Sequence, residues 1–262
     1  MTQGGGRIAL LAACALVLTT VACGGSDGPR TTAVFRYTNT DDPTGADRVP
    51  LVTIVGKRLA AFGITDVELK AEDEAVTVTV GDYDEAQLDQ AFAALERPGR
   101  FQVRPVLAIV ATTAPGLTAP EDDVYDAEVR LAERDGDGEI TAVYDLGPSA
   151  STGSPIDSAE AEEANGAWTV RLELSDDELE AFNEAAADCD ARARSCPTGR
   201  LAIIVDGQVL AAPTVEQPSY DPDQIQLAGR LDEAGARELA VVLDSGRLPV
   251  ELELETRSTD PG

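Results

Sequence analysis

The segment that decides the fold spans residues 199–250 and reads GRLAIIVDGQVLAAPTVEQPSYDPDQIQLAGRLDEAGARELAVVLDSGRLPV. Near its start, two short apolar runs flank the dipeptide Asp206-Gly207, which is a strong signal for a tight hairpin turn. Both Gly207 and Gly246 are expected to have positive φ angles, which glycine adopts at no steric cost. Strands are expected at residues 201–205, 208–211, 224–228 and 248–254, and a helix at residues 233–244. This mixture predicts an α+β fold.

Residues 33–106 predict a ferredoxin-like unit in which helices cover one face of a sheet. The first helix has an apolar stripe from Leu51 to Leu59 and ends at Gly63. Strands are expected at residues 33–38, 65–70, 75–80 and 101–106, and helices at residues 51–62 and 84–95. The resulting order, βαββαβ, is that of the ferredoxin-like fold.

Residues 107–255 predict a second α+β unit, followed by a tail at residues 256–262. Strands are expected at residues 126–131, 139–145 and 168–174, and a helix begins near Ser175. The Ser/Gly/Ala/Glu-rich segment 147–166 is expected to be a mobile excursion. Capping boxes are expected at Asp82 with Glu85 and at Ser175 with Glu178. The helix and strand that end the sequence can return to the first unit, which would make the second unit an insertion.

Residues 1–22 have the layout of a signal peptide. Arg7 is their one charge, an apolar run covers residues 8–18, and small residues precede Cys23. The run is too short to span a bilayer as a mature helix. Thr-Val-Ala-Cys-Gly-Gly-Ser resembles a bacterial lipoprotein cleavage site, which predicts that Cys23 is lipidated, anchors the chain to a membrane and is followed by a tether at residues 23–32. An ordinary secretory signal or a lone buried cysteine would explain the same residues.

The composition is strongly acidic and excludes several classes of function. The sequence has 48 acidic and 20 basic side chains, with a formal net charge of −28. Such a surface repels phosphate backbones, so no nucleic-acid role is expected. Histidine is absent, which removes the commonest general base, the commonest zinc ligand and every imidazole triad. No phosphate loop or nucleophile elbow is present, so the sequence predicts neither catalytic residues nor a cofactor.

Cys189 and Cys196 are expected to form a disulfide, because an exported chain folds in an oxidising compartment. A bond between them would close a short loop between a helix end and the strand at 201–205. A redox role is the alternative, although the spacing is not that of a C-x-x-C motif.

A weak calcium candidate consists of Asp135, Asp137 and Glu139, which have the oxygen spacing of a calcium loop. The twelfth position is Tyr144 instead of a bidentate glutamate, and strands are expected on both sides. An Asp-Gly hairpin turn explains the same residues, and the sequence predicts this turn in preference to a metal site.

Several stretches resemble the large extracytoplasmic domain of the protein-export subunit SecD. Residues 199–250 resemble the end of that domain, and the acidic segment 120–127 resembles part of its head subdomain. The helix that ends in Phe62-Gly63-Ile64 and the later Phe101-Gln-Val-Arg-Pro-Val106 resemble its base subdomain. The resemblance implies a base and head of the SecDF P1 type and a connection with protein translocation.

The chain also departs from that family. The family's Gly-Leu-Asp-Leu-x-Gly-Gly segment has no counterpart, and Tyr37-Thr-Asn-Thr-Asp-Asp stands near its place. The family's membrane helices would begin where this sequence stops. Proton-driven motor activity is therefore not expected of this chain.

These observations predict a lipid-anchored, extracytoplasmic binding module without enzymatic activity. Its expected partners are translocating or exported polypeptides, or components of the Sec export machinery, bound in a cleft between head and base. A cell-envelope scaffold or small-ligand-binding lipoprotein with no role in export is the alternative, and a calcium-tuned module is a third hypothesis.

Overall fold

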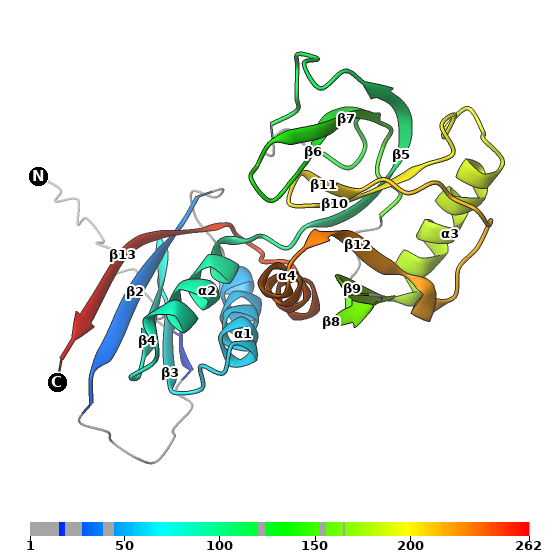
Figure 1. Cartoon of the computed structure of the whole chain (residues 1–262). Coiled ribbons are helices and arrows are strands. Elements are labelled where there is room, and N and C mark those ends of the chain that lie inside the picture. Colours follow the sequence, from blue (N-terminus) through cyan, green and yellow to red (C-terminus); the bar gives the residue numbers. More distant parts are fainter. Residues whose placement is uncertain are drawn as a thin grey trace, which may run out of the picture.

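The computed structural model describes residues 16–18, 28–38, 45–119, 124–151, 156–164 and 166–261. Among these residues, three sheets and four α-helices form two parts, and helix α4 (Glu233–Ser245) lies between them (Figure 1). The α+β prediction is confirmed.

The first part, here termed the base, is an antiparallel sheet with the strand order β1-β3-β4-β2-β13. Its strands are β1 (Leu16–Leu18), β2 (Arg30–Tyr37), β3 (Val67–Ala71), β4 (Ala75–Val80) and β13 (Leu252–Asp260). Helices α1 (Gly45–Ala61) and α2 (Glu85–Glu96) pack on it through a core that includes Phe35, Leu51 and Phe92. From β2 to β13 the chain follows the ferredoxin-like order βαββαβ, as predicted.

The fourth strand of the base is not the predicted one. Residues 101–106 belong to β5 (Phe101–Val110), which pairs with β10 and β7 outside this sheet, and β13 takes the expected place beside β2. The first four residues of β5 are all buried, as in a strand covered on both faces. The expected separation of base and head near residue 107 therefore does not follow the strand pairing.

Residues near both ends of the intervening segment lie side by side. The Leu248 N–H donates to the Pro98 carbonyl at 2.8 Å, so the chain leaves and re-enters the base at one point. We term residues 99–247 the head, which is an insertion between α2 and β13. Two other expectations were wrong at their edges. Arg30–Thr32 of the expected tether belong to β2 and pair with residues 258–260 of the expected tail, which belong to β13.

One half of the head is a closed barrel with the strand order β10-β11-β6-β7-β5. Its other strands are β6 (Val129–Arg134), β7 (Ile140–Leu146), β10 (Leu201–Val205) and β11 (Gln208–Ala211). Asp206 and Gly207 join β10 to β11 with φ angles of 52° and 76°, which confirms the predicted hairpin turn. Closure leaves this sheet without an edge.

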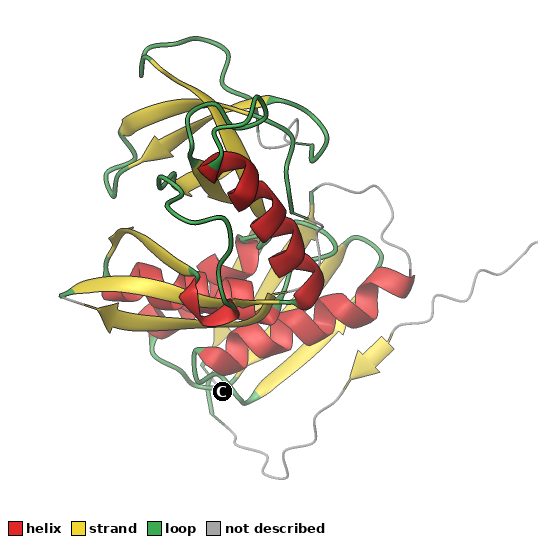
Figure 2. Ribbon diagram, turned by 90° about the vertical axis from the view of Figure 1, so that its right-hand side faces the viewer, coloured by secondary structure: helices red, strands yellow, loops and turns green. Residues whose placement is uncertain are grey.

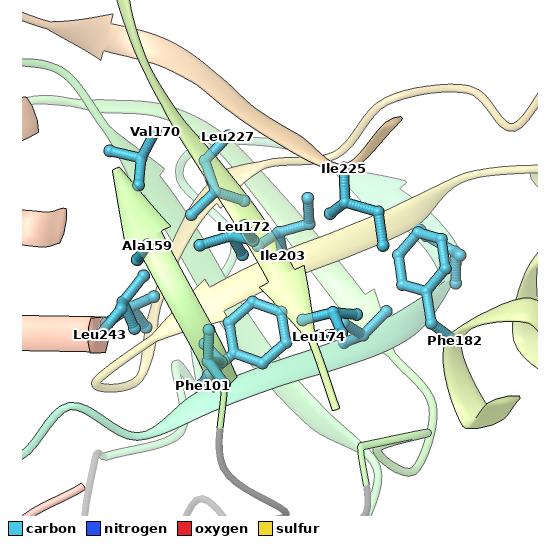
Figure 3. Packing of buried hydrophobic residues seen from close by; sticks show 14 of the residues in the cluster. Phe101, Ala159, Val170, Leu172, Leu174, Phe182, Ile203, Ile225, Leu227 and Leu243 are labelled. Atoms are coloured by element: carbon cyan, nitrogen blue, oxygen red, sulfur yellow. The ribbon is translucent and has the colours of Figure 1, made fainter. Parts of the chain in front are cut away.

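The other half of the head is a three-stranded sheet with two helices. Its order is β12-β9-β8, formed by β12 (Gln226–Leu231), β9 (Ala167–Leu174) and β8 (Ile156–Ala164). Figure 3 shows how Phe101 and Ile203 of the barrel strands pack with Leu172 and Leu227 of this sheet. In Figure 2, helix α3 (Asp176–Asp190) is turned toward the viewer, and the barrel strands lie above this sheet.

Strand β8 corrects the expectation of a mobile excursion at 147–166. Residues 158–164 pair with β9 in unbroken antiparallel register. Their core-facing residues include the small Ala159 and Ala161, and glutamates surround them, so no hydrophobic alternation marks the strand.

The expected capping boxes are wrong in detail. Asp84, not Asp82, caps α2 by accepting from the Ala86 and Gln87 amides. Ser175 occupies the N-cap of α3 but makes no side-chain capping bond. Phe182 of that helix is buried in the head core.

Helix α4 (Glu233–Ser245) joins head and base. It lies between α1 and α2 on one side and β8 and β9 on the other (Figure 1). Ala236, Leu239 and Leu243 face the head core, and the C-terminal Ser245 contacts the base. No helix among the described residues is long and apolar enough to cross a membrane.

Candidate functional site

A groove of about 800 Å³ lies where the head meets the base. Its apolar lining consists of Ala61 and Phe62 at the end of α1, Ala161 of β8, and Ala234, Ala240 and Val241 of α4. Ala61 and Ala234 are exposed, and Phe62 is half-buried. The site is therefore an open groove with a small-residue floor, in contrast to a closed cavity.

Charged side chains border the groove. Three carboxylates and one guanidinium line it, and each carboxylate has an arginine partner. The pairs are Glu160 with Arg171 (2.5 Å), Glu233 with Arg237 (2.5 Å) and Glu238 with Arg97 (3.3 Å). The first two pairs are largely exposed and contribute only about 0–1 kcal/mol each, so a cationic ligand can replace their arginines at little cost.

Trp168, the one tryptophan of the sequence, lies beside the groove. The Arg237 guanidinium, which lines the groove, lies over its ring at 5.7 Å from the ring centre. Trp168 itself is half-buried against the head core. A ligand that displaces Arg237 would therefore change the surroundings of the indole ring.

Arg58 holds the junction between α1, α2 and α4. Its side chain is fully buried. It donates to the Ala94 carbonyl (2.7 Å), the Arg97 carbonyl, Ser245 Oγ (2.9 Å) and the Gly246 carbonyl (3.0 Å). These acceptors lie at the C-terminal ends of α2 and α4, where helix dipoles favour a cation. Burial lowers the pKa of Arg58 to about 10, although nearby Asp206 acts in the opposite direction.

Gly99 is the residue that makes room for this arrangement. Its φ angle is +78°, and a Cβ there would lie 3.0 Å from Arg58 Nη2 and 3.3 Å from the Val242 carbonyl oxygen. A larger residue would therefore push α4 away from the base.

A second contact links the barrel to the chain segment that leaves the base. Asp206 in the β10–β11 turn accepts from the Arg100 amide at 2.7 Å and from Arg97 Nε at 3.4 Å. Arg97 also pairs with Glu238 of α4. The turn that the sequence predicted thus positions the barrel relative to α4.

The residues singled out by sequence lie away from the groove or outside the described residues. Cys23 lies outside them. Cys189 and Cys196 form a disulfide between α3 and β10, and both are buried. Neither cysteine lines the groove. The bond is therefore part of the head core and not of the candidate site.

Replacing both Cys189 and Cys196 with alanine should lower the free energy of unfolding by about 2–3 kcal/mol, because the bond restricts the unfolded chain. The bond spans a sequence separation of 7. Urea unfolding followed by circular dichroism measures the change. Reduction of the wild-type protein should reproduce it, and a change below about 0.5 kcal/mol in both experiments would contradict the prediction.

The calcium candidate forms the turn between β6 and β7. Asp135 Oδ1 accepts from the Asp137 amide at 3.1 Å and from the Glu139 amide at 3.0 Å. Gly138 has a φ angle of +81°. Within the described part of the chain, no three His, Cys, Asp or Glu side chains are grouped so that they could hold a metal ion. The predicted hairpin turn is present, and calcium binding stays a weak, untested alternative to it.

Tyr144, at the twelfth position of that candidate loop, predicts a loss of stability at high pH. Burial raises its pKa to about 12, and its hydroxyl donates to Glu133 at 2.8 Å. Because the folded-state pKa exceeds the unfolded value near 10, the stabilisation is complete below pH 10 and is lost as the pH rises to about 12. Tyr144→Phe should flatten this part of the stability curve measured by urea unfolding, and an unchanged slope would contradict the assignment.

Arg104 is the second fully buried arginine. It donates to the carbonyls of Val124 (2.7 Å), Ala127 (2.7 Å) and Gly147 (2.8 Å), and to Gln102 Oε1 (2.7 Å). These carbonyls flank the β6–β7 hairpin, so Arg104 fixes both ends of the hairpin to β5.

Sequence reasoning missed Arg58 and Arg104, although each left a signal. Arg58 occupies a position of the apolar stripe that runs from Leu51 through Val55, where a solvent-exposed arginine is not expected. Arg104 interrupts the apolar run of β5. A charge in an apolar pattern indicates a buried, hydrogen-bonded group.

Comparison with known proteins adds the family context of this architecture. Residues 123–250 match the model of the SecDF P1 head subdomain. This region contains the barrel strands β6, β7, β10 and β11, the three-stranded sheet and α4, but not β5 or most of the base.

Relatives of known identity extend the similarity to the base. The chain is 26% identical to the protein translocase subunit SecDF of Thermus thermophilus over 225 residues, which are 84% of this chain and 29% of that protein. It is 36% identical to SecD of Acidaminococcus fermentans over 118 residues, or 44% of this chain and 26% of that one. The chain thus spans less than a third of the length of these relatives.

Two solved structures share the fold. A crystal structure of SecDF in a super-membrane-facing form superposes with a TM-score of 0.66 and 22% identity, over 88% of this chain and 30% of that one. A second, of the membrane component SecDF that enhances protein export, gives 0.63 and 22%, over 86% of this chain and 98% of that one. The likeness shows that the base and head have the SecDF fold.

Proposed function

We propose that this chain is a SecD-like extracytoplasmic module that binds translocating or newly exported polypeptides, or components of the Sec machinery, in the groove between head and base. It acts by binding and not by catalysis. The observation that carries the proposal is the open groove of about 800 Å³ within an architecture similar to SecDF.

The residues that line the groove are suited to binding a translocating polypeptide. Its floor is made of small apolar residues such as Ala161 and Ala234, and its border carries Glu160 and Glu233. An apolar floor accepts varied side chains, and carboxylates attract basic residues. The net charge of −28 also discourages self-association.

Lipidation at Cys23 would place the module at a membrane surface on the extracytoplasmic side. Several acyl chains on one cysteine stabilise membrane attachment by about 0.8 kcal/mol per buried methylene. Mass spectrometry of the protein purified from membranes tests this part of the proposal, because a lipid on Cys23 adds a defined mass and Cys23→Ser abolishes it. An unmodified Cys23 would overturn the anchor and leave the groove unaffected.

Peptide binding can be followed through Trp168. Titration with a reduced, unfolded polypeptide should shift its emission, excited at 295 nm, by displacing Arg237 from the ring. Ala234→Tyr, which narrows the groove, should weaken binding at least fivefold. Ala191→Tyr, at the exposed C-terminal end of α3 and outside the groove lining, is the matched control (Figure 1). No binding by the wild-type protein would overturn the proposal.

A small-ligand-binding lipoprotein with no role in export is the alternative. The volume of the groove is compatible with it. Pockets for small molecules commonly measure about 300–1,000 Å³. They usually bury most of the ligand, whereas Ala61, Gln90 and Glu160 of this groove are exposed. Saturable binding of a small molecule with no response to polypeptides would favour this alternative.

A further inference from the structure

Strand β8 is an edge strand that borders the groove. It ends the three-stranded sheet, whose order is β12-β9-β8. Neighbouring residues of a strand point to opposite faces of its sheet. Glu160 and Ala161 nevertheless both line the groove, so the groove meets β8 at its edge.

Hydrogen bonds show which backbone groups of β8 point away from β9. The Ala159 N–H donates to Asp244 of α4 at 3.4 Å, although Ala159 pairs with Leu172 of β9. The Leu172 N–H in turn donates to the Ile225 carbonyl at 2.9 Å, on the other side of β9. The pair of Ala159 and Leu172 is therefore one that exchanges no bonds across the ladder.

Because backbone groups alternate along a strand, Ala161 and Glu163 also direct their N–H and carbonyl groups away from β9. Within the described part of the chain, no group bonds to these outward groups of Ala161 or Glu163. Ala159 is already engaged by Asp244. The open part of the edge thus begins at Ala161, where the groove lies.

The edge of β8 differs from two other places in the described structure. In the base, the Leu254 N–H of the edge strand β13 donates to Glu96 Oε1 at 2.9 Å. The barrel is closed. An edge left open beside a groove is suited to adding a strand.

We infer that the groove binds an extended polypeptide as an additional strand on β8, through the outward backbone groups of Ala161 and Glu163. This inference rests on the proposed function and names its mode of recognition. The main-chain bonds are independent of sequence, which suits a site that receives many different polypeptides.

The charges and the floor specify the side-chain pattern of the added strand. Ala161 faces α4, so the residues of the added strand on that face meet Ala234 and Val241 and are apolar. Glu160 and Glu162 point to the opposite face, where cross-strand lysine or arginine is favourable. The partner is therefore an extended segment that alternates apolar and basic residues.

The test uses an alternating Val–Lys heptapeptide and Trp168 fluorescence. We expect saturable binding, and at least tenfold weaker binding of an alternating Val–Glu heptapeptide. Two modified peptides are compared, one N-methylated at every Val and the other N-methylated at every Lys. One of them should lose binding and the other should keep it, because only every second N–H of an added strand faces β8. Equal effects of the two modifications would overturn strand addition and leave binding in the groove intact. No binding of the unmodified peptide, with binding of unfolded polypeptide retained, would overturn it as well.

A matched pair of variants tests the same edge from the side of the protein. Ala161→Pro removes an N–H that faces away from β9, so the ladder stays complete, and binding of the Val–Lys peptide should fall at least tenfold. Ala161→Val adds similar bulk, keeps the N–H and should change binding less than threefold. Equal losses in the two variants would overturn the inference. A dimer in sedimentation that the Ala161→Pro variant abolishes would assign the edge to a second copy and overturn it too.

Discussion

Replacing Arg58 with methionine should lower the free energy of unfolding by about 3–5 kcal/mol, the largest effect expected of a single substitution in the base. Methionine fills most of the space but donates no hydrogen bond. The carbonyls of Ala94 and Gly246 and the Ser245 hydroxyl would lose their donor at a junction closed to solvent.

The sign of this effect is not obvious, because a buried charge is itself costly. The pKa of Arg58, lowered to about 10 by burial, reflects that cost. Replacing a whole buried ion pair with apolar residues is often neutral. Here the acceptors are mainly backbone carbonyls, which no substitution removes, so the unmet acceptors outweigh the relief of desolvation.

Urea unfolding followed by circular dichroism measures the loss. Arg134→Met is the matched control, because Arg134 is exposed and donates to the Gly138 carbonyl at a hairpin turn. Its effect should stay within about 0.5 kcal/mol. The loss in Arg58→Lys should lie between those of Arg58→Met and Arg134→Met, since one ammonium cannot reach acceptors on both helices. A loss below 1 kcal/mol in Arg58→Met would show that the junction does not depend on this side chain.

Local patterns predicted local structure well. The Asp206-Gly207 turn, the helix that carries Phe182, the Cys189–Cys196 bond and the first five predicted elements of the base, from β2 to α2, are all present. Each depends on neighbours within a few residues, or on a periodicity that survives in a short window.

Long-range pairing was the part that the sequence did not predict correctly. Strand β13 pairs with β2 although their residues lie more than 200 positions apart, and a local pattern does not distinguish it from β5. Strand β8 was missed because its glutamates and alanines lack hydrophobic alternation. The groove combines α1, β8 and α4, so its lining depends on these pairings and could not be read from any one segment.

Replacing Arg104 with methionine should lower the free energy of unfolding by about 3–4 kcal/mol and should loosen the barrel in particular. Arg104 is the donor for Val124 and Ala127 before β6 and for Gly147 after β7. Without it, both ends of the hairpin lose the side-chain link to β5 that supports the β5–β7 ladder, through which the barrel closes.

Amide hydrogen exchange distinguishes this local effect from general destabilisation. The Gly147 amide, which donates to the Pro105 carbonyl, should exchange at least tenfold faster in Arg104→Met, because opening of the barrel releases it. The Leu69 amide in the base sheet should be affected less. Arg171→Met is the control, since Arg171 forms only exposed pairs with Glu160 and Glu162, worth about 0–1 kcal/mol each. Equal acceleration in base and barrel would contradict the assignment, because it would mean that Arg104 supports the whole chain and not the closure of the barrel.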